Sequence, residues 1–131
     1  MDLNEISSKV IGAAIAVHNE LGPGLLESVY NACMAIELQS RGMRVASEVA
    51  LPIMYRGQKI SENGLRIDLL VENTIVVELK SIEEILPVHK KQLFTYLRLA
   101  NKPVGLLINF NNILLKDGII RIVNSPIGDA G

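Results

Sequence analysis

The chain has 131 residues, 49% of them hydrophobic, and its 13 basic and 14 acidic side chains leave a formal net charge of −1. A chain of this length forms one domain that buries roughly two thirds of the surface of its unfolded state, so it needs no disulfide staples. The near-neutral charge argues against a module that holds nucleic acid by charge alone. It weighs less against an enzyme, because a bound divalent cation adds positive charge locally.

The cellular compartment is predicted from the cysteine content and from the lack of long apolar runs. Cys33 has no disulfide partner and no metal-ligand spacing, which fits a reducing compartment and a small buried core thiol. No apolar run approaches the ~18–20 residues that span a bilayer, and residues 1–5 lack the basic start of a signal peptide. The sequence therefore predicts a cytoplasmic protein that does not associate with membranes.

Two helices are expected at the start of the chain. Asp2 and Glu5 have the spacing of a capping box, and apolar residues then recur every three or four positions for about five turns. Gly22-Pro23-Gly24 ends this first helix, because proline cannot continue the hydrogen-bond ladder. A second helix is predicted over residues 25–41, and Gly42 is placed to close it.

The pattern then changes to the period of two that is typical of strands. The expected elements are outer strands within residues 44–60 that turn at Arg56-Gly57, a hairpin over residues 66–80, a helix over 87–100, a buried strand over 104–108 and a strand over 119–123 after a tight turn at Asp117-Gly118. The order αα-ββββ-αβ predicts a mixed α/β (α+β) fold with a mixed central sheet flanked by helices. We expect one domain over residues 1–124 and a loose tail over 125–131.

The hairpin carries the charged residues of interest. If Glu72-Asn73-Thr74 forms its loop, Val71 faces Ile75 and Asp68 faces Glu78, whereas a two-residue loop would place the two acids on opposite faces. With the three-residue loop, one face is expected to hold Arg66, Asp68, Leu70, Val76, Glu78 and Lys80, and the other Ile67, Leu69, Val77 and Leu79.

Opposed residues of antiparallel strands have Cβ atoms only ~4.5–5.5 Å apart, so two carboxylates there repel unless a positive charge lies between them. A divalent cation is the obvious candidate. The alternative is a solvated charge face on which Lys80 simply pairs with Glu78.

Several segments together resemble a known group of enzymes. Asp68 followed by Glu78-Leu79-Lys80 resembles the Asp…Glu-x-Lys signature of the PD-(D/E)XK nuclease superfamily. Gly24-Leu25-Leu26-Glu27-Ser28-Val29-Tyr30 is similar to the pattern that names the GxxExxY family, one branch of that superfamily. The resemblance runs over residues 18–109 and includes Gln92-Leu93-Phe94-Thr95-Tyr96 after the hairpin. Ile67 stands where the superfamily name has a proline, a common variation.

The resemblance implies a restriction-endonuclease-like core and a set of site residues. Asp68, Glu78 and the Leu79 carbonyl are expected to ligate Mg²⁺ or Mn²⁺, which prefer oxygen ligands. Lys80 would orient the attacking water or help to deprotonate it. Glu27 would be a third catalytic carboxylate, although an acid in the first turn of a helix is also favoured by the helix dipole alone.

Four further residues are candidates for substrate contacts. Gln92 and Tyr96 are four positions apart and share one face of the predicted third helix, although Tyr96 could equally border a core. Tyr30 could be a core residue or a substrate contact. His18 lies just before Gly22-Pro23-Gly24, where it could approach a phosphate or serve only as a surface or capping residue.

These observations lead to the hypothesis of a metal-dependent nuclease that hydrolyses phosphodiester bonds in DNA or RNA, with DNA favoured. The alternative is a non-catalytic module that uses the same fold to bind nucleic acid or protein, as part of a defence or toxin system. A chain of 131 residues leaves little room for a separate recognition domain, so specificity would require a protein partner or a homodimer.

Overall fold

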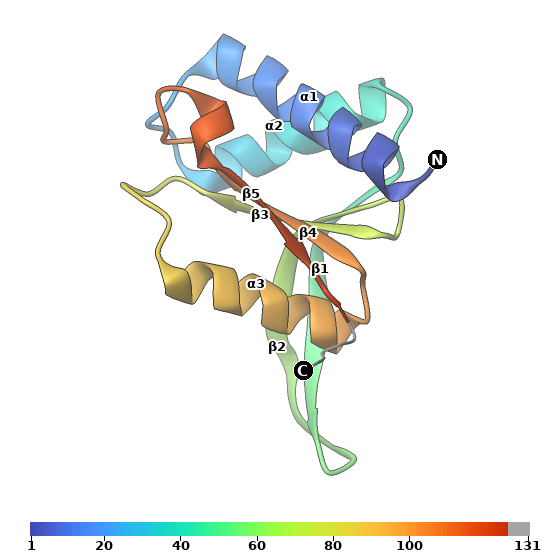
Figure 1. Ribbon diagram of the computed structural model, residues 1–131. Coiled ribbons are helices and arrows are strands. Elements are labelled where there is room, and N and C mark those ends of the chain that lie inside the picture. Colours follow the sequence, from blue (N-terminus) through green and yellow to red (C-terminus); the bar gives the residue numbers. More distant parts are fainter. Residues whose placement is uncertain (126–131) are drawn as a thin grey trace.

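The computed structural model describes residues 1–125, apart from the side chains of residues 62 and 63. The elements are α1 (Leu3–Leu21), α2 (Glu27–Ser40), β1 (Val45–Tyr55), β2 (Gln58–Val71), β3 (Ile75–Lys80), α3 (Pro87–Ala100), β4 (Val104–Asn109), the 3₁₀ turn η1 (Leu115–Gly118) and β5 (Ile119–Val123), as Figure 1 shows. Residues 126–131 of the predicted tail lie outside the described residues.

The strands form one mixed sheet in the order β1-β2-β3-β4-β5. β3 and β4 are parallel and α3 connects them, whereas the other neighbouring strands are antiparallel. α1 and α2 lie on one face of the sheet and α3 on the other (Figure 1). The predicted class, a mixed sheet flanked by helices, is therefore confirmed.

The helix ends follow the signals in the sequence. The Asp2 carboxylate accepts a hydrogen bond from the Glu5 N–H (2.8 Å), and the Glu5 carboxylate accepts one from the Asp2 N–H (3.2 Å), which completes the capping box. α1 ends at Gly22, whose φ of 72° suits glycine. α3 has the predicted bounds, with Pro87 in its first turn and Asn101 in the left-handed conformation after its last.

The strand count before α3 differs from the prediction. The segments expected as separate strands on either side of residues 61–65 form one strand, β2, so three strands precede α3 instead of four. β2 is continuous because β1 pairs with it from Val45–Val71 to Tyr55–Gln58. Gly64, which looks like a turn signal, lies extended within β2, where a side chain would collide with Ile53.

Smaller differences occur at other element ends. α2 begins at Glu27, two residues later than expected, and the predicted tight turn at Asp117-Gly118 is the end of the 3₁₀ turn η1. Cys33 is half-buried at the margin of the core instead of fully buried. None of these differences changes the order of the layers.

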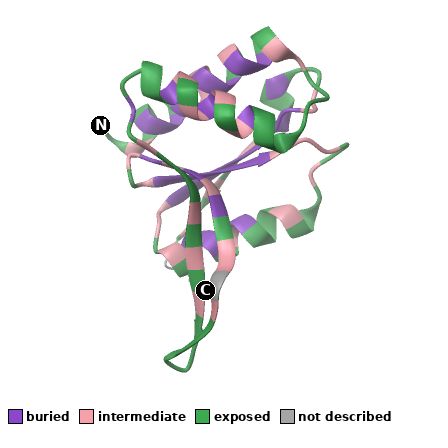
Figure 2. Cartoon of the chain, turned by 180° about the vertical axis from the view of Figure 1, so that it is seen from behind, coloured by how far each residue is buried: buried purple, intermediate pink, exposed green. Residues whose placement is uncertain are grey.

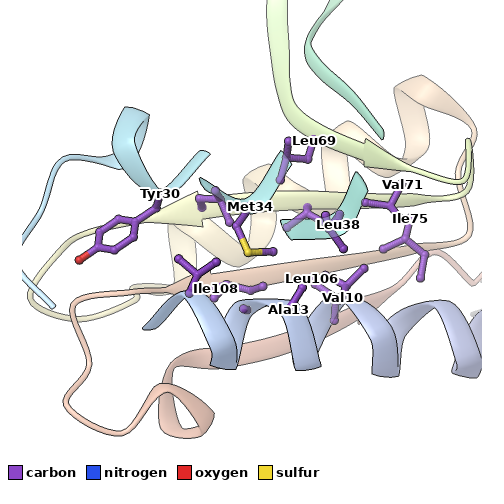
Figure 3. Close-up of a cluster of buried hydrophobic side chains, with 14 of the residues drawn as sticks. Val10, Ala13, Tyr30, Met34, Leu38, Leu69, Val71, Ile75, Leu106 and Ile108 are labelled. Carbon is purple, nitrogen blue, oxygen red and sulfur yellow. The ribbon is translucent and has the colours of Figure 1, made fainter. Parts of the chain in front are cut away.

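Two apolar cores lie on the two faces of the sheet. The core under α1 and α2, part of which Figure 3 shows, includes Val10, Ala13, Met34, Leu38, Leu69 and Leu106. The core under α3 is formed by Ile67, Val76, Leu93, Tyr96, Leu97 and Leu107. β3 and β4 are covered on both faces, which explains their nearly continuous apolar sequences. Among the described residues, no helix combines the length and the hydropathy needed to cross a membrane.

Beyond the cores, β1 and β2 continue together as an arm. The arm, residues 52–64, extends away from the helices and ends in the turn at Arg56-Gly57 (Figures 1 and 2). The pairing of β1 and β2 shifts register between Leu51 and Ile53 and again between Ile53 and Met54, which is typical of bulges that increase the twist of a ribbon. Figure 2 shows that the arm is exposed along most of its length.

Candidate active site

The loop of the β2–β3 hairpin fixes how its charged residues face one another. Glu72, Asn73 and Thr74 form the loop, Val71 pairs with Ile75, and the Thr74 N–H donates to the Val71 carbonyl (3.0 Å). Glu72 and Asn73 both have positive φ values, 52° and 53°. The predicted three-residue loop is thus confirmed.

Asp68 lies where the backbone pairing of β2 is interrupted on both sides. The β2–β3 pairing ends at Leu69–Val77, one residue before Asp68 and Glu78 would pair. The β1–β2 pairing runs through Ser47–Leu69 and resumes at Val49–Ile67, and so omits Glu48 and Asp68. Both gaps fall at the same point in the sheet.

Side-chain hydrogen bonds replace the ladder at this gap. The Leu79 N–H donates to the Asp68 carboxylate (2.8 Å), and the Asp68 N–H donates to the Glu78 carboxylate (3.3 Å). The Lys80 carbonyl accepts from the Phe110 N–H of the segment that follows β4. Because successive residues of a strand direct their backbone groups to opposite neighbours, the N–H and C=O of Leu79 point toward β2 and the gap.

The two carboxylates are crowded and largely withdrawn from water. Glu78 is only 7% exposed. Burial, and then the charge of Asp68, raises the pKa of Glu78 to about 8. Burial also raises the pKa of Asp68, against the hydrogen bond from Leu79, and the charges of Glu27 and Glu48 add to the increase. The site therefore holds more negative charge than its surroundings compensate.

Lys80, the last residue of β3, is the basic residue nearest in sequence to Glu78. Its charge lowers the pKa values of both Asp68 and Glu78, but less than burial raises them. No hydrogen bond or ion pair of the Lys80 ammonium is found in the part of the chain that the structure describes. The alternative in which Lys80 simply pairs with Glu78 is therefore not observed.

The expected division of side chains between the two faces holds for the apolar residues near the loop and fails at the start of the hairpin. Leu70 and Val76 pack toward α3, and Leu69, Val77 and Leu79 pack toward α1 and α2. The placement of Ile67 with Leu69 was wrong, because Ile67 belongs to the core under α3. Leu65 packs against the same core, so by strand alternation Arg66 is on the opposite face and its placement with Leu70 and Val76 was wrong as well. The change in alternation coincides with the gap in the pairing and with Glu48, whose φ of 55° bends β1 out of a regular strand.

The start of α2 brings a third acid to the gap. Glu27, the first residue of α2, lines a pocket together with Ser28, Asn31, Glu48 and Asp68. The Ser81 N–H donates to the Glu27 carboxylate (3.3 Å), so the first turn of α2 contacts the end of β3. The expected approach of Glu27 to the hairpin is seen in these contacts and in its electrostatic effect on Asp68 and Glu78.

Glu48 is a fourth acid, which sequence reasoning missed. It accepts a hydrogen bond from the Asn31 amide (2.9 Å), and its carboxylate is 3.6 Å from the Arg66 guanidinium. A lone glutamate in an edge strand gives no signal of its role. A positive φ at glutamate is uncommon and cannot be read from the residue type.

Tyr30 is a core residue, one of the two alternatives that the sequence left open. It is fully buried and stacks on Phe110, with ring centroids 4.4 Å apart. Its hydroxyl donates to the Gly22 carbonyl (2.6 Å) and accepts from the Leu25 N–H (3.1 Å). Tyr30 therefore holds the loop between α1 and α2, and through it the position of Glu27.

His18 has a similar structural environment. It is buried, and Nε2 is hydrogen-bonded to the Asn112 carbonyl (2.8 Å). His18 does not line the pocket that contains Asp68. Its predicted phosphate contact stays a prediction, and its contacts in the structure tie α1 to the loop after β4.

The two candidates on α3 differ in their surroundings. Tyr96 is only 7% exposed, and its pKa is raised by burial and then by the charges of Glu78 and Asp68, which places the phenol near the carboxylates. Gln92 is exposed one turn earlier, and its side chain makes no hydrogen bond within residues 1–125. A substrate contact by Gln92 stays a prediction.

Asn109, a second residue that sequence reasoning missed, fixes the chain that leaves the site. It is fully buried at the end of β4, and its amide group accepts from the Ile82 N–H (3.1 Å) and donates to the Ile82 carbonyl (2.9 Å). The available signal was a polar residue inside an otherwise apolar run, Val104 to Phe110. Asn109 thereby fixes the segment that follows Lys80.

Comparison with known families agrees with this geometry. The chain matches a family model described as the PD-(D/E)XK nuclease superfamily over residues 4–122. It therefore belongs to the PD-(D/E)XK nuclease superfamily. Neither a search of curated proteins nor one of solved structures gives a match. Members of this superfamily generally depend on divalent metal ions, and membership indicates a nuclease-type function.

The residues at the gap fit such an ion. Carboxylate and carbonyl oxygens are the ligands that Mg²⁺ and Mn²⁺ prefer. The Asn31 side-chain oxygen is buried beside the same pocket without a hydrogen-bond partner, so it could accept from a water of a hydrated cation. No three His, Cys, Asp or Glu side chains of the described residues are grouped tightly enough to hold an ion by themselves. Mg²⁺ usually binds through one or two carboxylates and keeps several waters, so this finding is compatible with it.

Proposed function

We propose that this protein is a metal-dependent nuclease that hydrolyses phosphodiester bonds, with DNA as the favoured substrate over RNA. The observation that carries the proposal is a pair of carboxylates, buried Glu78 and partly buried Asp68, at a gap in the strand pairing, with no cationic side chain among the described residues bonded to either. Such a pair is costly in an apoprotein and becomes favourable when a doubly charged ion is bound.

Asp68, Glu78 and the Leu79 carbonyl would hold Mg²⁺ or Mn²⁺, and Glu27 would support them across the pocket. The bound ion supplies Lewis acidity toward a phosphate oxygen and lowers the pKa of a coordinated water. The role of the protein is to hold these oxygens at fixed positions, which the hydrogen bonds from Leu79 and Ser81 accomplish.

Lys80 would act on the substrate itself. By strand alternation it shares a face with Glu78, so its ammonium can orient the attacking water and offset the charge that develops on the phosphate. Tyr96 would contribute a hydroxyl as a hydrogen-bond donor to a phosphate oxygen, because a tyrosine phenol is protonated at neutral pH. Gln92 is proposed as a more distant substrate contact on the same helix.

Cleavage assays test this proposal. Labelled single-stranded DNA, duplex DNA and RNA are incubated with the protein and Mn²⁺, Mg²⁺ or EDTA, and the wild type is compared with Lys80→Ala and with Lys116→Ala, an exposed lysine on η1. We expect metal-dependent cleavage that falls by about 100-fold or more in Lys80→Ala and is unchanged in Lys116→Ala. Equal activity of Lys80→Ala and wild type would assign the cleavage to a contaminant and refute the proposed site.

A non-catalytic binding module is the second candidate. It is favoured by the lack of three closely grouped metal ligands among the described residues, and the net charge of −1 suits a module that binds protein better than one that binds nucleic acid. A thermal-shift titration separates the candidates, because an ion at ~100 times its dissociation constant should stabilise the fold by about 2.7 kcal/mol. If neither Mg²⁺ nor Mn²⁺ shifts the melting temperature, the binding module is the better proposal. A homodimer, a protein partner for specificity, a defence or toxin context and a cytoplasmic location also stay predictions from the sequence.

A further inference from the structure

The arm of residues 52–64 presents large side chains that the rest of the protein does not cover. Met54, Tyr55 and Ile60 are 53%, 63% and 62% exposed. The arm extends past α3, and its tip lies beyond both helical layers (Figures 1 and 2). An exposed aromatic and apolar surface of this kind indicates a binding role.

The charge of the arm is opposite to that of the whole chain. Residues 52–66 contain Arg56, Lys59 and Arg66 but only one acidic residue, Glu62, which gives a local formal charge of +2 in a chain whose net charge is −1. This positive charge is therefore a property of the arm and the adjoining Arg66, not of the protein as a whole. A local excess of Arg and Lys favours a polyanion as the partner.

The tip of the arm combines a cation with an aromatic ring. The Arg56 guanidinium carbon lies 5.7 Å from the centroid of the Tyr55 ring. Arg56 has a φ of 51° in the turn that joins β1 to β2. A guanidinium binds phosphate and stacks on bases, and a tyrosine ring offers a face to a base, so the pair suits nucleic acid better than an apolar protein surface.

The base of the arm adjoins the candidate active site. Arg66 is half exposed, and its guanidinium is 3.6 Å from the carboxylate of Glu48, which lines the pocket that contains Asp68. Only Ile67 separates Arg66 from Asp68 along β2. This one long ion pair leaves most of the five N–H donors of Arg66 available to a phosphate at the mouth of the pocket.

From these observations we infer that the arm is the DNA-binding element of this protein. Its two strands enter the major groove of duplex DNA, Tyr55 and Arg56 contact the DNA at the tip, and Arg66 holds a phosphate beside the pocket. The inference rests on the proposed nuclease function. The major groove, ~12 Å wide, admits a two-stranded ribbon. The eight steps from Gln58 to Arg66 span about 26 Å at ~3.3 Å per residue, less than the ~34 Å of one helical turn, so tip and pocket engage the same turn of DNA.

Binding is measured apart from cleavage by fluorescence anisotropy with a labelled 24-base-pair duplex and Mn²⁺, in the Lys80→Ala background. The test variant adds Tyr55→Ala and Arg56→Ala, and the matched control adds Arg121→Ala, which removes one exposed arginine from β5 at the opposite edge of the sheet. We expect the tip variant to bind at least 10-fold more weakly and its log–log salt slope to fall by about one, whereas the control binds within two-fold of its parent. The altered side chains are exposed, so the melting temperature should not change.

Other outcomes overturn the inference in distinguishable ways. If the tip variant binds duplex as its parent does while the wild type still cleaves DNA, the arm is not the binding element and the proposed function stands. If the parent dimerises in sedimentation velocity and the tip variant does not, with DNA affinity unchanged, the arm binds a second copy of the chain. If the parent binds no duplex or single strand and the wild type cleaves neither, the inference and the proposed function fail together.

Discussion

Replacing Glu78 by glutamine should remove most of the pH dependence of stability in the metal-free protein. The carboxyl of Glu78 has a pKa of about 8 in the folded protein and an ordinary value of 4.5. Between these values the unfolded chain has lost the proton that the folded protein keeps. A higher pH therefore favours the unfolded chain, and the stabilising contribution of the proton is lost as the pH rises toward 8.

The size of this effect follows from the gap between the two pKa values. Each pH unit in this window lowers the free energy of unfolding by ~1.4 kcal/mol, so the rise from pH 6 to pH 8 costs roughly 2 to 3 kcal/mol. Asp68 changes in the same direction, because its pKa is also raised. Glu78→Gln has no charge to bury, and we expect its stability relative to the wild type to rise by this amount between pH 6 and pH 8.

The assay is urea denaturation in EDTA at pH 6, 7 and 8, followed by circular dichroism for the wild type, Glu78→Gln and Glu83→Gln. Glu83 is an exposed glutamate that controls for the loss of a negative charge. Saturating Mn²⁺ should flatten the pH dependence of the wild type, because the ion compensates the buried charge. A wild type whose stability is the same at pH 6 and 8, or a Glu78→Gln variant that keeps its pH dependence, would refute the argument that the buried carboxylate is uncompensated.

Three other substitutions test separate contacts. Asp68→Asn should leave the metal-free protein as stable or make it more stable, since it relieves repulsion, and should abolish the thermal shift caused by Mn²⁺; a loss above ~1 kcal/mol in EDTA would contradict this. Tyr30→Phe removes a buried hydroxyl that bonds the loop before α2, and we expect a loss of about 1 to 2 kcal/mol in urea denaturation together with weaker Mn²⁺ binding; unchanged stability would show that the hydroxyl bonds are dispensable. Asn109→Ala leaves the N–H and the C=O of Ile82 without their side-chain partner and should lower the free energy of unfolding by about 2 to 3 kcal/mol. A melting temperature equal to that of the wild type would show that Asn109 does not stabilise this segment.

The elements governed by local signals were predicted well. The capping box at Asp2, the bounds of α3 and the register of the β2–β3 loop depend on residues close in sequence, so the pattern alone was sufficient. Asp68 and Glu78 were placed together for the same reason, because a three-residue loop leaves only one register.

Features that depend on distant contacts could not be predicted in the same way. The continuity of β2 through Gly64 depends on pairing with β1, which overrides the turn preference of glycine. Glu48 reaches the site because β1 leaves the ladder at a left-handed residue, and no sequence pattern marks a glutamate for that conformation. Tyr30 was ambiguous because its partners, Gly22 and Phe110, belong to other segments.

The link between Ser81 and the start of α2 has a consequence for how the site tolerates change elsewhere. The Ser81 hydroxyl donates to the Leu25 carbonyl (2.6 Å), so the residue that follows β3 is joined directly to the loop that precedes α2. The arm takes no part in this contact, and its length depends on the pairing of β1 with β2 alone. Hairpins of longer or shorter reach could therefore be grafted between β1 and β2 while the acids and the lysine keep their spacing. Substrate preference and catalytic geometry would then be separately adjustable parts of one small domain.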